Sequence, residues 1–206
     1  MLEHGESIRA ESGAMVSMSP TVEVDSKVSG GIGKAIGRLL GGESLFQSFF
    51  TAQHGPGEVL LAPAGPGDII MCDPGPGMVV TSGAYLAGNT ALDIKTQANL
   101  KGFFGGEGLF MMHVTGPGPL FLSSFGAIHS VDLGPGESYI VDTGHLVAFS
   151  MTMNYDLKRA AKGLFGSFTS GEGIVARMTG PGRIYIQTRN PSGFGALLAP
   201  HIPAKG

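Results

Sequence analysis

Short runs in which apolar residues alternate with polar or small residues recur along the whole chain. Clear examples lie at 58–62, 68–71, 146–151 and 183–187. Such alternation places successive side chains on opposite faces of an extended chain, so each run is typical of a β-strand with at least one buried face. Glycine and proline gather between the runs and predict turns. The pattern therefore favours an all-β fold class.

The turn residues themselves recur in threes. A marker of two glycines separated by seven residues occurs at 5–13, 75–83 and 136–144. A Gly-Glu marker occurs at 42–46, 106–110 and 171–175, and a Gly-Pro-Gly marker occurs at 55–57, 116–118 and 180–182. The three markers keep one order at intervals of 61 to 70 residues. Ordered repetition of this kind indicates three internal repeats of one structural unit.

We expect the repeats to share one core in a single all-β domain over residues 1–206. They span about residues 1–62, 63–125 and 126–190, and a C-terminal tail follows at 191–206. A unit of about 64 residues would be only marginally stable alone. We expect about four strands per repeat, a pseudo-threefold axis and two sheets packed as a sandwich. The paired-glycine marker would lie in one hairpin, and Gly-Pro-Gly would join two further strands.

Short helical connectors are predicted within the repeats. In 31–40 and 157–165, apolar residues fall on one side of a helix and basic residues on the other, whereas 100–104 is shorter. Either these helices pack on a sheet with their basic residues in water, or they touch an anionic membrane surface, where each basic residue adds about 1 kcal/mol. The residues assigned to such a contact are Lys34, Arg38, Lys101, Lys158, Arg159 and Lys162.

Charge and composition narrow the partners and the location. The net charge is −3 and the pI is near 6.0, which argues against DNA and against RNA as partners. The only cysteine, Cys72, sits in an apolar run and is expected in the core. The N-terminus lacks the pattern of a signal peptide, and no run of about 18 apolar residues occurs. We therefore expect a cytoplasmic protein, with peripheral membrane contact as an alternative.

Catalytic and cofactor motifs are incomplete. The stretch 30–35 lacks both the first glycine and the hydroxyl residue of a phosphate-binding loop. The stretch 136–147 has the spacing of the second cupin motif, which supplies a metal-binding histidine from a β-barrel. Val147 occupies the histidine position, and its equivalents in the other repeats are Val16 and Leu86. We therefore expect no catalytic, cofactor-binding or metal-binding residue.

One polar trio remains as an alternative site. His129, Asp132 and His145 flank the Gly-Pro-Gly at 134–136, and a hairpin there would bring them close together. Together they would form a metal or acid/base site. The competing interpretation is that both histidines are ordinary strand or surface residues.

Four segments together resemble a known family. These are 5–13, 41–46, 115–118 and 184–189. They resemble the family that includes the fungal "altered inheritance of mitochondria" protein and bacterial members labelled as a domain of unknown function. The resemblance covers nearly the whole chain. It implies an all-β fold like that of the trp RNA-binding attenuation protein, near the double-stranded β-helix, and it brings no catalytic residues; mitochondrial members are associated with the inner membrane.

Three functional hypotheses follow. The first is a non-enzymatic β scaffold that assembles into a homo-oligomer and contacts a protein partner or an anionic membrane surface through its basic connectors. The second is a small-ligand-binding or enzymatic cupin-like barrel without the usual metal histidines. The third is RNA binding, which rests on fold analogy alone.

Overall fold

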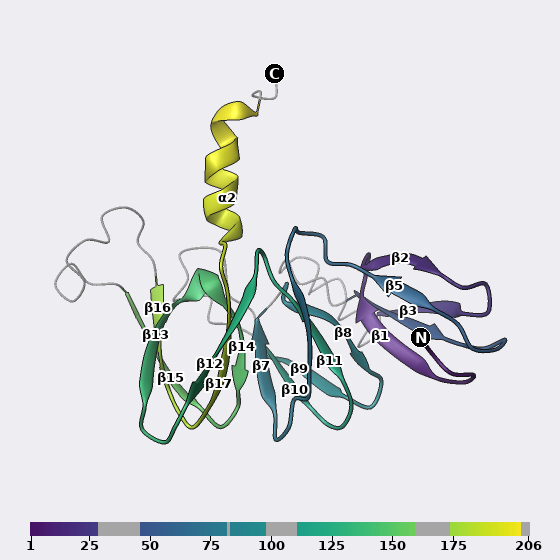
Figure 1. Ribbon diagram of the computed structural model, residues 1–206, viewed down its shortest axis with the longest axis horizontal. Helices are drawn as coiled ribbons and strands as arrows, with labels where there is room; N and C mark the ends of the chain where they lie inside the picture. The colour runs from purple at the N-terminus through teal and green to yellow at the C-terminus, as the bar shows by residue number, and fades with distance from the viewer. Residues whose placement is uncertain (29–45, 82, 98–110, 160–173, 203–206) are drawn as a thin grey trace.

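Strands dominate the part of the chain that the computed structural model describes, residues 1–28, 46–81, 83–97, 111–159 and 174–202 (Figure 1). The all-β prediction is therefore confirmed. The strands are β1 (Ser7–Glu11), β2 (Met15–Met18), β3 (Glu23–Val28), β4 (Phe46–Thr51), β5 (Val59–Leu61), β6 (Ile69–Cys72), β7 (Met78–Thr81), β8 (Tyr85–Asn89), β9 (Asp93–Gln97), β10 (Met111–Thr115), β11 (Leu120–Ser123), β12 (Ile128–Leu133), β13 (Ser138–Asp142), β14 (Leu146–Ser150), β15 (Asn154–Arg159), β16 (Ile174–Thr179) and β17 (Gly182–Gln187). The helical elements are η1 (Thr143–His145), α2 (Pro191–Leu198) and η2 (Ala199–His201).

The described strands form four antiparallel sheets. Two sheets have six strands, in the orders β3-β4-β1-β8-β11-β6 and β12-β17-β14-β7-β10-β9. The third is β13-β16-β15, and the fourth is β2-β5. Figure 1 shows the sheets following one another along the longest axis, with β2 and β5 at one end and β13, β15 and β16 at the other.

The paired-glycine marker marks the crossing between two sheets. β1 and β2 lie in different sheets, as do β7 and β8, and also β13 and β14. The prediction of a hairpin at each marker is therefore wrong. The physical reason is the pairing partner, because β1 forms its backbone hydrogen bonds with β4 and β8 and leaves β2 to pair with β5. Gly13 and Gly83 make the crossing at φ +87° and +82°, a region that favours glycine.

The Gly-Pro-Gly turns also carry the chain between sheets. The turn at 116–118 joins β10 to β11, and the turn at 180–182 joins β16 to β17, each time in a different sheet. A further Gly-Pro-Gly lies at 65–67, and the backbone approaches its last glycine closely. A Cβ on Gly67 would overlap the backbone carbonyl oxygen of Ser124, and Gly67 forms a β-bridge with Gly126.

The same strand pairings recur in residues 1–62, 63–125 and 126–190, called the first, second and third segments below. The triples β3-β4-β1, β9-β10-β7 and β15-β16-β13 correspond, and so do the pairs β2-β5, β8-β11 and β14-β17. The described strands number five, six and six per segment, not about four. A pseudo-threefold axis and a single domain remain predictions.

Apolar side chains pack between successive sheets in three clusters. Phe50 and Leu86 belong to the cluster nearest the N-terminus. Val80 and Leu120 belong to the middle cluster, and Phe149 to the third. All residues of β7 are buried, as are nearly all those of β8 and β14. These strands lie where one six-stranded sheet joins two segments. The core therefore continues from one segment to the next.

The structure changes the assignment of the third connector. The stretches 31–40 and 100–104 lie outside the described residues, as does the remainder of the third connector from 160 onward. Leu157, Lys158 and Arg159 belong to β15 and not to a helix, because their backbone pairs with β16 in the register Leu157↔Ala176. Backbone pairing across the sheets therefore extends further than the amphipathic pattern predicted.

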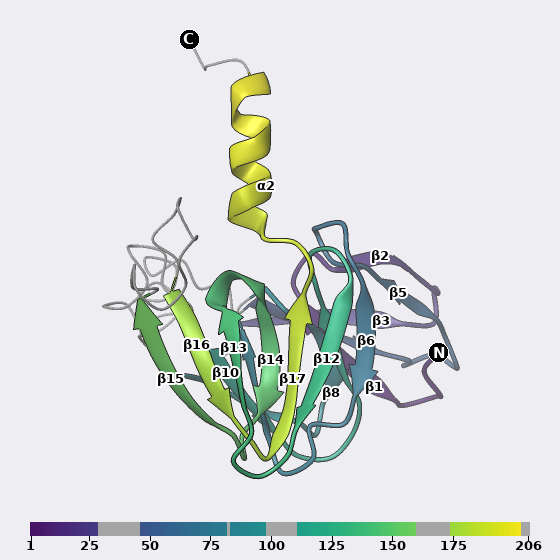
Figure 2. The same cartoon turned by 60° about the vertical axis from the view of Figure 1, so that its left-hand side comes forward.

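The expected C-terminal tail begins with a helix. α2 rises away from the sheets in both views (Figures 1 and 2). The side chain of Asn190 accepts hydrogen bonds from the backbone N–H groups of Ser192 and Gly193, and Pro191 occupies the first turn. An Asn N-cap followed by proline is a recognised helix start, so this signal was present in the sequence.

Gly67→Ala is expected to lower the free energy of unfolding by about 1–3 kcal/mol, because the new methyl group must displace the backbone at Ser124. Gly134→Ala is the matched control, since its Cβ would meet only the flexible Glu137 side chain at 3.4 Å. Urea unfolding of both variants measures the difference. Equal stability of the two variants would contradict the packing described at Gly67.

Candidate functional site

The polar trio predicted from the sequence lies on two elements at the β12–β17–β14 part of its sheet. His129 and Asp132 both belong to β12, and His145 ends η1 just before β14. Leu133 packs in the third apolar cluster and Ile128 in the middle one, so the two faces of β12 look toward different cores. By strand alternation, His129 shares the face of Leu133, and Asp132 lies on the opposite face. The structure therefore does not direct the three side chains to one point.

Asp132 is engaged by an arginine on the neighbouring strand. Arg183 Nε donates to Asp132 Oδ1 at 2.6 Å and its Nη2 donates to Oδ2 at 2.7 Å. This paired hydrogen bonding lowers the pKa of the Asp132 carboxyl group and raises the pKa of Arg183. A carboxylate held in this way is ionised at neutral pH and is suited to joining strands rather than to proton transfer.

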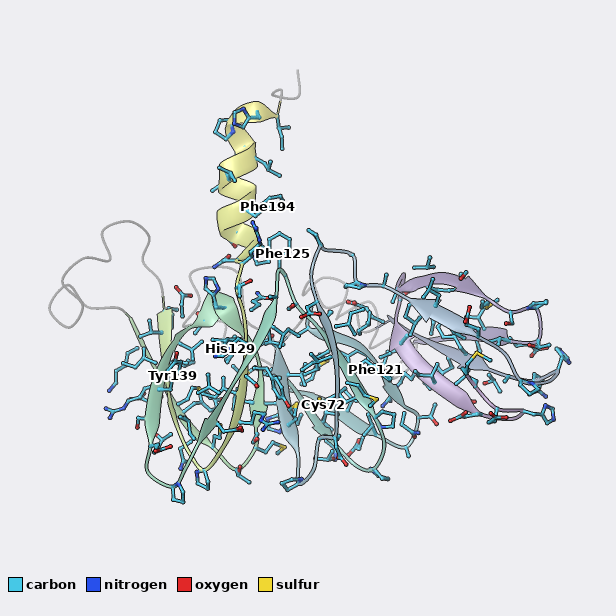
Figure 3. All side chains as sticks on the ribbon, in the orientation of Figure 1. Cys72, Phe121, Phe125, His129, Tyr139 and Phe194 are labelled. Atoms are coloured by element: carbon cyan, nitrogen blue, oxygen red, sulfur yellow. The ribbon has the colours of Figure 1, made fainter. Side chains whose placement is uncertain are left out.

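The two histidines are placed as strand-end and surface groups. His145 Nδ1 lies 2.8 Å from the carbonyl oxygen of Gln187, so it donates a hydrogen bond to the end of β17. His129 is exposed on β12 and is labelled in Figure 3. Across the described ranges, no group of three or more His, Cys, Asp or Glu side chains is arranged to hold a metal ion. The absence of a metal in the protein stays a prediction.

The three positions compared with the cupin histidine occupy one structural feature. Val16, Leu86 and Val147 each lie at a β-bulge, where β2, β8 and β14 shift register against their partners. Leu86 and Val147 are buried in apolar clusters, whereas Val16 is 57% exposed. The bulge turns an apolar side chain toward a neighbouring core. The first segment has no preceding segment, and its side chain at this position, Val16, faces water.

The basic residues assigned to an anionic contact are mostly outside the described chain. Four of the six lie outside the described residues: Lys34, Arg38, Lys101 and Lys162. Lys158 is exposed on β15, and its Nζ lies 2.9 Å from Asp156 Oδ2. Arg159 is the last residue of β15. The structure thus shows one of the six in a surface ion pair, which contributes little to stability, and the gathering of all six stays a prediction.

Cys72 lies on β6 and packs against the middle apolar cluster. Burial, together with the charge of Asp73, raises the pKa of its thiol to about 11. The protonated thiol therefore dominates at neutral pH, and a thiolate nucleophile is disfavoured there. Cys72 is therefore a partly buried residue at the border of the core and not enclosed by it as expected.

A polar cluster between the first and second segments was not singled out from the sequence. Arg9 Nη2 donates to the carbonyl oxygen of Leu92 at 2.6 Å, and the Tyr85 hydroxyl donates to the carbonyl oxygen of Arg9 at 3.1 Å. Burial raises the pKa of Tyr85 to about 12 and also raises the pKa of Glu11. Arg9 Nε is buried and lacks a hydrogen-bond partner among the described residues. These contacts tie β1 to the following segment.

The two strands at the ends of the molecule expose apolar side chains. β2 is exposed along its whole length and carries Met15, Val16 and Met18. β13 exposes Ile140 and also Tyr139, which is labelled in Figure 3. Within the described residues, β2 pairs only with β5, and β13 pairs only with β16. We call β2 and β13 the end strands, and each presents an unpaired backbone edge beside apolar side chains.

The C-terminal helix is a second apolar surface. Phe194 contacts Phe125 with ring centroids 5.2 Å apart at the base of α2 (Figure 3). Leu197, Leu198 and Ile202 are exposed beyond that contact. No described helix is long and apolar enough to cross a membrane. α2 is therefore an exposed apolar element held to the sheets near its first turn.

Comparison with known proteins gives matches over nearly the whole chain. The family model described as Mitochondrial biogenesis AIM24 matches residues 1–189. An uncharacterized protein of Streptococcus pyogenes serotype M6 is 36% identical over 213 residues, which cover 98% of this chain and 85% of that protein. A Streptococcus pyogenes protein solved by X-ray crystallography is similar at a TM-score of 0.79 and 33% identity, covering 98% of this chain and 92% of that one. The resemblance found in the sequence is confirmed.

Arg183→Gln is expected to raise the pKa of Asp132 toward the ordinary value of about 3.9, because the two hydrogen bonds that favour the carboxylate are lost. In the unaltered protein, the contribution of the pair is present at neutral pH and is lost as the pH falls through the lowered pKa. A carbon-13 NMR titration of the carboxyl group measures this. Arg177→Gln, on β16, is the control, and the prediction fails if both variants leave the pKa where it was.

Proposed function

The chain belongs to the family described as Mitochondrial biogenesis AIM24, and we propose that it acts as a non-enzymatic β scaffold that associates with itself. The observation that carries this proposal is the pair of end strands. Each has an unpaired backbone edge within the described residues and exposes several large apolar side chains. Such edges form contacts with other chains unless they are covered or guarded by charge.

The polar residues of the described chain support a structural role. Asp132 binds Arg183, His145 binds the end of β17, and Arg9 joins the first segment to the second. Each of these groups is used to connect strands, and none is paired with a nucleophile or a proton-transfer partner. The cupin-like alternative would need polar groups where Leu86 and Val147 are buried in apolar clusters. RNA binding rests on fold analogy alone and is disfavoured by the negative net charge.

Sedimentation velocity over a range of concentrations tests the scaffold proposal. The full chain is expected to show a mass that rises with concentration, since association is a mass-action process. Val16→Glu should shift the protein toward the monomer because it places a charge beside the exposed edge of β2. Val24→Glu on β3 is the matched control, as Val24 is also an exposed strand valine. A monomer at every concentration would overturn the proposal.

A second candidate function is contact with an anionic membrane surface, favoured by the apolar side of α2 and η2. Phe194, Leu197 and Leu198 are all at least partly exposed on α2, which projects from the sheets (Figure 2), and the exposed Ile202 directly follows η2. An exposed apolar helix beside basic residues lies in the interfacial plane of a bilayer and binds weakly and reversibly. In this proposal, Lys34, Arg38, Lys101, Lys158, Arg159 and Lys162 supply the attraction to anionic lipid.

Co-sedimentation with vesicles separates this function from simple packing. We expect pelleting with phosphatidylserine-containing vesicles at low salt, with much less at high salt or with neutral phosphatidylcholine vesicles, because screening weakens the attraction. Leu197→Glu should reduce pelleting, since Leu197 is 66% exposed, whereas Val24→Glu should leave it unchanged. Equal pelleting with both lipids, or none with either, would contradict the membrane proposal.

A further inference from the structure

Two junctions inside the chain use one register. Between the first and second segments, β1 pairs with β8 as Ile8↔Asn89, Arg9↔Gly88 and Ala10↔Ala87. Between the second and third segments, β7 pairs with β14 as Met78↔Ser150, Val79↔Phe149 and Val80↔Ala148. Counted from the first glycine of each paired-glycine marker, the three pairs occupy the same positions in both junctions. The junction is therefore a repeated contact with a defined register.

A third combination of equivalent strands exists, but its two strands do not pair with each other in the part of the chain that the structure describes. The counterpart of β1 and β7 in the third segment is β13, and the counterpart of β8 and β14 in the first segment is β2. Neither strand has a partner on the corresponding edge among the described residues. Figure 1 shows β13 and β2 toward opposite ends of the longest axis, so one chain does not join its own ends.

We propose that β13 of one molecule pairs antiparallel with β2 of a second copy of this chain, in the register Tyr139↔Ser19, Ile140↔Met18 and Val141↔Ser17. These are the positions that pair at both internal junctions. The inference rests on the proposed self-association and adds its strands, its register and its direction. Because the two surfaces differ, the contact is head-to-tail, and its repetition gives a ring or a filament.

The burial of equivalent residues supports this contact on the β13 side. Val79 is buried against Phe149 in the third apolar cluster because the β7–β14 junction covers it. Ile140 occupies the equivalent position on β13 and is 46% exposed. At the second junction the following segment buries the apolar side chain at this position, and a second molecule would supply the same cover for Ile140.

The β2 side shows the same contrast. Leu86 and Val147 are buried, whereas their equivalent Val16 is exposed. On the strand paired with β2, Leu60 is 51% exposed, whereas its equivalents Phe121 and Tyr185 pack against apolar clusters. The exposed apolar patches on the two ends are therefore the two halves of one junction.

The charges on other edge strands explain why the end strands are the ones to pair. β3, β9 and β15 occupy sheet edges and each carries at least two charged residues, which discourage pairing with another chain. β2 carries none, and β13 carries only Asp142 at its last position. β5 and β6 are also uncharged edge strands, and they expose Leu60 and Met71. However, neither edge corresponds to an internal junction. The counterparts of β5, which are β11 and β17, are paired on that side by β6 and β12 of their own segments, and the free edge of β12 has no partner among the described residues.

Disulfide trapping tests the register in a Cys72→Ser background. Ile140→Cys and Met18→Cys proteins are mixed and oxidised, and directly opposed residues of antiparallel strands lie within the Cα separation that a disulfide needs. We expect a disulfide-linked heterodimer, and chains of linked molecules from the double variant. Ser17→Cys, mixed with Ile140→Cys, is the off-register control. It should give little disulfide-linked product, because adjacent residues face opposite sides of a strand.

Charge substitutions test the same contact without cross-linking. Ile140→Lys is expected to raise the apparent dissociation constant about tenfold or more in sedimentation, because it would place a charge in a desolvated contact. Val24→Lys is the matched control and should associate like the unaltered protein. Circular dichroism and urea unfolding check that each variant is folded.

Several outcomes would overturn the inference. In the trapping experiment, these are a disulfide formed within one molecule, homodimers of Ile140→Cys as the main product, or as much product with Ser17→Cys as with Met18→Cys. In sedimentation, it is association that is lost in Met71→Lys but retained in Ile140→Lys. In each of these cases the chain can still associate, and the scaffold proposal survives. If the unaltered chain stays monomeric at all concentrations, the scaffold proposal fails as well.

Discussion

Backbone pairing between successive segments, β1 with β8 and β7 with β14, is the interaction on which the rest of the structure depends. These two junctions join the separate strand triples and pairs into six-stranded sheets. The second junction also buries side chains on both faces of one strand. Val79 and Val80 are neighbours on β7, yet they pack in different apolar clusters. Removing either junction would expose two apolar surfaces at once.

The junction constrains the backbone more strongly than the side chains. Arg9 and Val79 occupy equivalent positions, but one forms a hydrogen bond to the carbonyl oxygen of Leu92 and the other packs in an apolar cluster. Strand hydrogen bonds are made by every residue type except proline, so pairing tolerates this exchange. The first junction adds Tyr85, whose hydroxyl donates to the carbonyl oxygen of Arg9. The same backbone pairing is thus accompanied by polar side-chain contacts at the first junction and by apolar packing at the second.

Local patterns predicted the strands and turns but not the strands that would pair. Alternation in 146–151 and 183–187 identified β14 and β17, and the markers identified the positions at which the chain turns. The hairpin prediction failed because the partners of β1 are β4 and β8, and both are distant in sequence. The helix expected from Leu157 failed for the same reason, since pairing with β16 overrode an amphipathic pattern. Pairing between distant strands leaves little signal in any short window.

The candidate site was harder to predict than the fold, because exposure depends on the neighbour and not on the residue. Val16 and Val147 are the same amino acid at equivalent positions, yet one is exposed and the other is buried. The sequence alone gives them the same expectation. The end strands emerge only when the three segments are seen in order and the missing neighbour is identified (Figure 1). The N-cap of α2, by contrast, was a local signal that could have been used.

Covalent linkage separates the two internal junctions from the proposed third one. Segments that are joined through the chain meet at a high effective concentration, so their junctions form with little dependence on protein concentration. A junction between β13 and the β2 strand of another molecule uses the same kind of backbone contact without that advantage. The fraction of end strands paired in this way therefore rises with protein concentration and falls when a partner covers one end. A scaffold built in this way keeps a fixed internal register while its length or closure remains adjustable, and capping one end strand would stop growth at that end.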